Sequence, residues 1–104
     1  MRRVVVTGIG AVTPVGNDIK TTWDNLVNGV SGIDFIPEER FSTEGLKVKI
    51  AGLVKNFEPT KYFEKKDLRK NDLYTQYAVA AATEAVEDSD ILGKIEEDNF
   101  GVYV

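Results

Sequence analysis

Three cations of this chain are spaced so that they could act together. Lys66, Arg69 and Lys70 follow one another at i, i+3 and i+4, so on a helical turn their side chains project from one face. They lie in the segment 61–70, which carries five basic and two acidic residues, a local charge of +3 in a chain of net charge −4. Such a patch fits docking of an anionic partner. The plainer interpretation is a solvated helix face with local ion pairs, and the residues alone favour it.

Two glycines near the start invite a different chemistry. Gly8 and Gly10 follow an apolar run and precede a helix, as in loops that bind the phosphates of a dinucleotide. That fingerprint needs a third glycine where Thr13 stands, and Pro14 intrudes where the helix should begin. We therefore interpret the glycines structurally, as residues that permit a tight exit from a strand.

The carboxylates of the segment 84–98 are a third candidate. Seven of them stand against Lys94 alone, but they lack the D-x-D-x-D-G spacing of a calcium loop. A solvated helix end or loop explains them. The sequence predicts no metal site and no cofactor.

The absence of two residue types excludes several kinds of catalysis. The chain has no cysteine and no histidine. It therefore has no disulfide, no thiol nucleophile, no Ser-His-Asp arrangement and no zinc finger. An enzyme made only of these residues would have to work with carboxylates, lysines, tyrosines and hydroxyls.

The composition is that of a folded protein, with 42% hydrophobic and 29% charged residues over 104 positions. The net negative charge argues against general nucleic-acid binding. No apolar run approaches the ~20 residues of a membrane span, and none forms a signal-peptide core. Together with the lack of cysteine, this leads us to expect a cytoplasmic protein.

The first elements are predicted in the order strand, loop, helix, which is typical of a layered α/β fold. Arg3 to Ile9 is predicted as a buried strand, because it contains three consecutive β-branched valines. A helix capped by Asn17 or Asp18 is predicted to run to about Asn28. Its apolar residues fall on one face, which predicts that Trp23 lies in the core.

The middle of the chain is less regular. Residues 29–60 show no sustained period and predict an insertion or surface excursion, in which 48–54 could form a short, partly exposed strand. A longer helix capped by Asn71 or Asp72 is predicted over about 73–87. Its alanine-rich interior is apolar almost all round, which is typical of a helix buried in a layered protein.

The end of the chain is predicted to be another strand, over 99–104, and the chain stops on the apolar residue Val104. Two strands and a hairpin-like excursion are too little sheet to cover the alanine-rich helix. We therefore expect the chain to be the first part of a longer protein.

Motifs along the whole chain point to one protein family. They are RRVVVTGIGAVTPVGN at 2–17, SGI at 31–33, AGLVKNF at 51–57, RKND at 69–72, QYA at 76–78 and AVEDS at 85–89. Together they resemble the β-ketoacyl-acyl-carrier-protein synthases of type II, the condensing enzymes of fatty acid synthesis. The motif Thr13-Pro14-Val15-Gly16 after the first predicted strand is specific. One departure is Asn71, at a position where the family more often has Met.

The resemblance implies a thiolase-like fold of two related α/β halves, with mixed sheets between helices, in a homodimer. Residues 1–104 would be a partial N-terminal half. In the family an acyl chain passes from its carrier protein to a cysteine, and a carbanion from malonyl carrier protein then attacks the thioester. Two histidines stabilise the developing oxyanion. No position here matches these catalytic residues, which we expect downstream of Val104, so we predict that the chain alone is inactive.

The resemblance also implies a role for the three cations. In the family, basic residues just before the long helix contact the acidic recognition helix of the acyl carrier protein. The matching positions are Lys66, Arg69 and Lys70, which favours docking over a merely solvated face. Two alternatives stay open: a non-catalytic partner subunit of the chain-length-factor type, and a self-contained small binding module.

Overall fold

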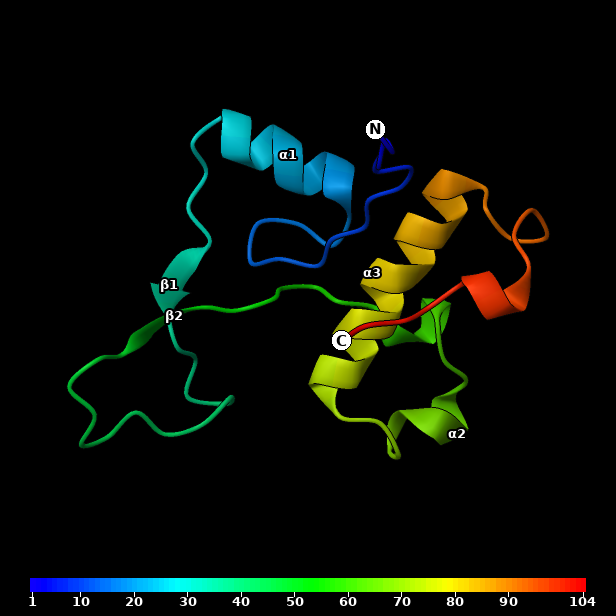
Figure 1. Ribbon diagram of the computed structural model, residues 1–104. Coiled ribbons are helices and arrows are strands. Elements are labelled where there is room, and N and C mark those ends of the chain that lie inside the picture. The colour runs from blue at the N-terminus through cyan, green and yellow to red at the C-terminus, as the bar shows by residue number, and fades with distance from the viewer.

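The computed structural model describes residues 1–104, and the helices α1 (Ile19–Val27) and α3 (Leu73–Ser89) carry most of its regular structure (Figure 1). The third helix is α2 (Lys65–Leu68), the strands are β1 (Ile33–Phe35) and β2 (Ile50–Gly52), and the 3₁₀ turns are η1 (Pro59–Lys61) and η2 (Glu97–Asn99). No helix combines the length and the apolar character that crossing a bilayer would require.

Helix α1 begins and ends as its sequence predicts. The Asp18 carboxylate accepts hydrogen bonds from the backbone N–H of Thr21 at 2.7 Å and from its hydroxyl at 3.0 Å. The helix ends at Val27 with Asn28 as its C-cap, and Gly29 follows with a φ of 69°, the left-handed conformation that glycine adopts most readily. The prediction that Trp23 lies in the core is wrong, because Trp23 is 64% exposed and no element covers that face of α1.

Strands β1 and β2 form the sheet of this chain. They pair antiparallel, with Ile33 opposite Gly52 and Phe35 opposite Ile50. The predicted strand over 48–54 is thus confirmed at its centre, inside the predicted excursion. Its partner β1 was not predicted, although Ile33 and Phe35 alternate with Asp34 in the way a half-exposed strand does.

The N-terminal strand predicted over 3–9 is not formed. The segment pairs with no other strand. Val4, Val5 and Val6 are 95%, 67% and 79% exposed, so this run is not buried either. The physical reason is that a strand needs a ladder partner, and no segment of these 104 residues provides one.

The C-terminal strand predicted over 99–104 is not formed either. The segment begins inside η2, and the residues from Phe100 to Val104 have no regular structure and no strand beside them. Val102, Tyr103 and Val104 are exposed. The apolar pattern of this segment predicted a strand, but no neighbouring strand is present to pair with its backbone.

Helix α3 lies against the N-terminal segment, with α2 near its start, and the β1–β2 hairpin projects away from it (Figure 1). Asp72, one of the two predicted residues, occupies the N-cap position of α3, but the Asp72 side chain makes no capping hydrogen bond. Only Gln76 and Ala80 of the 17 residues of α3 are buried, which agrees with the expectation that this chain provides too little sheet to cover the helix. The chain provides cover for one side of α3 and leaves the rest open.

Gly8 and Gly10 bring the N-terminal segment against α3. A Cβ at Gly8 would collide with the backbone carbonyl of Ala85, and one at Gly10 with that of Ala81. The two glycines are therefore structural, as predicted, but the partner that requires them is the backbone of α3.

Candidate functional site

The three predicted docking cations lie on and just after α2. Lys66 belongs to the helix, and Arg69 continues it with φ −73° and ψ −17°. The backbone N–H of Lys70 then donates to the carbonyl of Asp67 at 3.1 Å, which keeps the chain in a helical turn. All three side chains are exposed. We call Lys66, Arg69 and Lys70 the basic surface.

Side-chain amides hold the end of α2 against α3. Gln76, a buried residue of α3, donates to the carbonyl of Asn71 at 3.0 Å and to that of Leu68 at 3.4 Å. Asn71 in turn donates to the carbonyl of Asp67 at 2.9 Å. These bonds satisfy carbonyls that a helix end otherwise leaves without partners. The departure from the family at position 71 thus provides a cap for the helix that carries the basic surface.

Aromatic rings fix the chain that leads into α2. Phe57 stacks on Tyr62 with ring centroids 6.3 Å apart, and meets Tyr77 of α3 edge to face at 5.0 Å. Edge-to-face and offset-stacked rings are the favourable geometries for aromatic pairs. Both ends of the basic segment are therefore attached to α3.

The charges of the basic surface are not equally free. Lys66 Nζ lies 3.0 Å from a carboxylate oxygen of Glu64, and Lys70 Nζ lies 4.0 Å from one of Asp67. Arg69 forms no ion pair. Arginine is also the cation that pairs bidentately with carboxylates, so Arg69 is the group best placed to meet an acidic partner.

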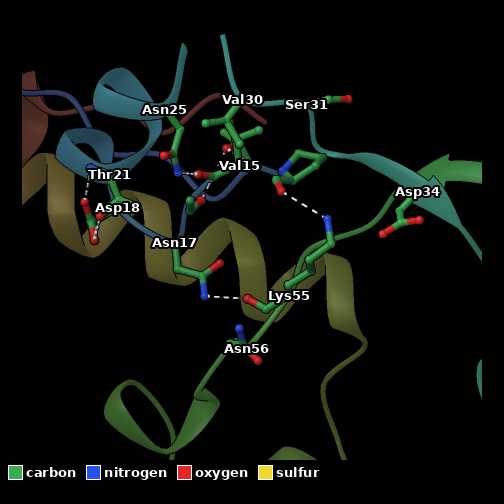
Figure 2. Close-up of a pocket in the computed structure, with 13 residues that line it drawn as sticks. Val15, Asn17, Asp18, Thr21, Asn25, Val30, Ser31, Asp34, Lys55 and Asn56 are labelled. Carbon is green, nitrogen blue, oxygen red and sulfur yellow. Dashed lines mark hydrogen bonds between the residues drawn. The ribbon is translucent and has the colours of Figure 1, made fainter. Parts of the chain in front are cut away.

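A polar hollow of about 500 Å³ lies where the 13–18 loop, α1 and the 55–56 segment meet (Figure 2). Lys55 extends across it, and its ammonium donates to the carbonyls of Gly32 at 3.2 Å and Pro14 at 3.5 Å. The amide of Asn17 donates to the carbonyl of Lys55 at 2.8 Å, as Figure 2 shows. These groups link three stretches of backbone, so the hollow serves as a structural junction.

The same junction shifts the pKa of the Asp18 carboxyl. The hydrogen bond from the backbone N–H of Thr21 lowers the pKa of the Asp18 carboxyl below its usual value, with the Thr21 hydroxyl and nearby Lys20 adding to the effect. Asp18 is thus held as an anion at the positive end of α1. The hollow contains neither thiol nor imidazole, because the chain has none.

Two acidic residues of α3 have a role that the sequence did not reveal. Glu84 accepts hydrogen bonds from the backbone N–H groups of Ala11 and Ile19, both at 2.9 Å. Asp88, one turn later, accepts from Ile9 at 3.1 Å. The interpretation of 84–98 as a solvated stretch is therefore wrong at its start. The i, i+4 spacing on one helix face was the only available signal, and it did not identify the partner.

Comparisons with known proteins agree along the chain. Residues 1–104 match the family described as "Beta-ketoacyl synthase, N-terminal domain". The chain is 46% identical over 104 residues to 3-oxoacyl-[acyl-carrier-protein] synthase 2 of Staphylococcus aureus (strain COL), covering 99% of this chain and 25% of that protein. It is 47% identical over 98 residues to the Vibrio harveyi protein of the same name, covering 94% of this chain and 23% of that one.

A solved structure supports the same relationship. "The ishigamide ketosynthase/chain length factor" matches with a TM-score of 0.74 and 37% identity, over 96% of this chain and 23% of that one. The fold is therefore the predicted α/β fold, the N-terminal part of a thiolase-like ketosynthase. The chain spans about a quarter of the length of the curated relatives it matches.

Proposed function

This chain belongs to the beta-ketoacyl synthase family, in its N-terminal domain, and on that premise we propose that it serves as a segment of a 3-oxoacyl-[acyl-carrier-protein] synthase II. The observation that carries the proposal is the 46% identity to a synthase of that name across 99% of the chain. Residues 1–104 would be part of the N-terminal half of a cytoplasmic homodimer.

The proposed reaction is a decarboxylative Claisen condensation. An enzyme cysteine takes the acyl group from its carrier protein as a thioester. Malonyl carrier protein loses carbon dioxide, and its carbanion attacks that thioester, which forms a carbon–carbon bond and releases the thiol. The product is a 3-oxoacyl carrier protein. Since residues 1–104 contain no thiol and no imidazole, the groups for these steps are proposed to lie downstream of Val104.

The contribution of this segment is docking of the acyl carrier protein. The proposal is supported by the exposure of Lys66, Arg69 and Lys70 and by the absence of an ion pair at Arg69. An exposed cluster of cations on an otherwise acidic chain attracts an acidic partner and steers its approach. Gln76 and Asn71 hold the cluster in place without neutralising it.

The alternative is a partner subunit of the chain-length-factor type, which keeps the fold without the cysteine. The similar solved structure is named for both a ketosynthase and a chain length factor. That name covers both kinds of subunit, so the proposal of a synthase rests on the 46% identity to a protein named as a synthase.

Assay of the full-length gene product separates the two. Purified protein is incubated with acyl and malonyl carrier protein, and both carbon dioxide and the 3-oxoacyl product are measured. A synthase forms both and carries the acyl group covalently, seen as a mass shift of the intact protein. A protein that forms neither product and shows no mass shift would contradict the proposal and favour the partner subunit.

A further inference from the structure

We propose that Glu64 and Asp67 restrain carrier-protein binding by pairing with two of the three cations of the basic surface, an inference that rests on the proposed docking function. Both carboxylates come from the same short segment as the cations they meet. Lys66 is paired at 3.0 Å and Lys70 at 4.0 Å. An acidic partner therefore meets two lysines whose charge is already partly compensated by internal carboxylates, so each lysine attracts the partner less strongly.

Glu64 is the competitor with no other task. It occupies the cap position before α2, but its side chain makes no capping hydrogen bond, and it is 73% exposed. Asp67 lies within α2, and its carboxylate is more enclosed and farther from its lysine. Removal of the Glu64 charge should therefore release Lys66 without disturbing the helix.

The expected effect is modest because both partners are in water. Lys66 is 74% exposed, so the ion pair is screened by solvent and weak. Releasing it should raise the efficiency with a carrier-linked substrate about two- to fivefold. Arg69 keeps its full charge at all times, which leaves a basal affinity that the internal pairs do not touch. A partly self-neutralised surface of this kind suits a partner that must dissociate after each turnover.

The test compares Glu64→Gln with a matched control in the full-length gene product. The control is Glu44→Gln, which removes the same charge from an exposed residue without an ion pair. Glu44 belongs to the loop between β1 and β2, on the opposite side of the molecule from α2 (Figure 1). At low salt, kcat/KM for malonyl carrier protein should rise in Glu64→Gln and stay unchanged in Glu44→Gln. The rise should vanish at high salt.

A second pair of variants shows whether the gain acts through Lys66. In a Lys66→Met background the Glu64→Gln change should have no further effect, since the cation it releases is gone. A gain of equal size in that background, or none in the wild-type background, would overturn the inference. Arg69→Glu separates this from the proposed function. If Arg69→Glu lowers kcat/KM while Glu64→Gln changes nothing, the docking function is supported and the restraint by Glu64 is contradicted. If neither variant has an effect, both proposals are contradicted.

Discussion

At the scale of single residues, Asp18 shows how one side chain both starts a helix and responds to pH. Its carboxylate accepts two hydrogen bonds from Thr21, and its pKa is lowered as a result. A lowered folded pKa means that the unfolded chain binds the proton more tightly. The contribution of Asp18 to stability is therefore complete above the unfolded value, about 3.9, and is lost as pH falls through the folded one.

We predict that Asp18→Ala destabilises α1 by about 1 kcal/mol at neutral pH, because the capping acceptor is lost. Asp18→Asn should be nearly neutral there, since asparagine caps as well as aspartate. Hydrogen exchange of the α1 amides in the full-length gene product measures both. Below about pH 4 the wild-type amides should lose protection while Asp18→Asn does not follow. Equal loss in both proteins would contradict the assigned titration.

At the scale of elements, Glu84 joins α1 to α3. It accepts from Ile19 at the first turn of α1 and from Ala11 in the loop before it. A carboxylate at this end of a helix also meets the positive end of its dipole. No other side chain accepts a hydrogen bond from either of these two N–H groups.

We predict that Glu84→Ala lowers the free energy of local unfolding around α1 by about 1–3 kcal/mol, because two part-buried N–H groups lose their acceptor. Glu87→Ala is the matched control, being an exposed glutamate on the same helix whose side chain makes no hydrogen bond. Exchange rates of the Ala11 and Ile19 amides provide the measurement. Equal rates in the two variants would show that Glu84 does not hold α1.

Local signals predicted the elements that local chemistry can form. The ends of α1 follow from Asp18 and Gly29, whose side chain and backbone act within one turn, and α3 follows from its long run of helix-forming residues. The predictions of strands over 3–9 and 99–104 were wrong. A run of β-branched and aromatic residues indicates a tendency to be extended, but a strand also needs a partner from a distant part of the chain.

The candidate site divides in the same way. The spacing of Lys66, Arg69 and Lys70 is local, and the structure places them on or beside the short helix α2. Their ion-pair partners are also local. The bonds of Gln76 to the end of α2 and of Glu84 to the start of α1 join separate elements, and nothing in the sequence indicated which backbone groups they would meet.

At the scale of the whole molecule, the chain exposes more surface than a folded protein of its size. Its accessible area is 8829 Å², whereas a compact monomer of this mass exposes about 5,800 Å². The radius of gyration is 17.1 Å, against about 13 Å for a compact domain of this length. Only 4 of the 104 residues are buried. The elements are formed, but they enclose almost no core.

We predict that the 104 residues in isolation have no cooperative thermal transition, because so little apolar surface is removed from water. Circular dichroism should show partial helicity that declines gradually on heating, and calorimetry should show no sharp heat-capacity peak. A sharp, reversible melt of the isolated monomer would show that the chain is stable without further partners.

Above all, the basic surface is proposed to dock an acyl carrier protein in an elongating ketoacyl synthase. The most direct measurement compares two substrates in the Arg69→Glu, Lys70→Glu variant of the full-length gene product. With carrier-linked substrate, kcat/KM should fall about tenfold or more at low salt and by less at high salt. With a small acyl thioester that carries no protein, kcat/KM should stay within about twofold, since that substrate has no acidic surface for the two cations to attract. Unchanged kinetics with the carrier, or an equal loss with both substrates, would contradict the docking role.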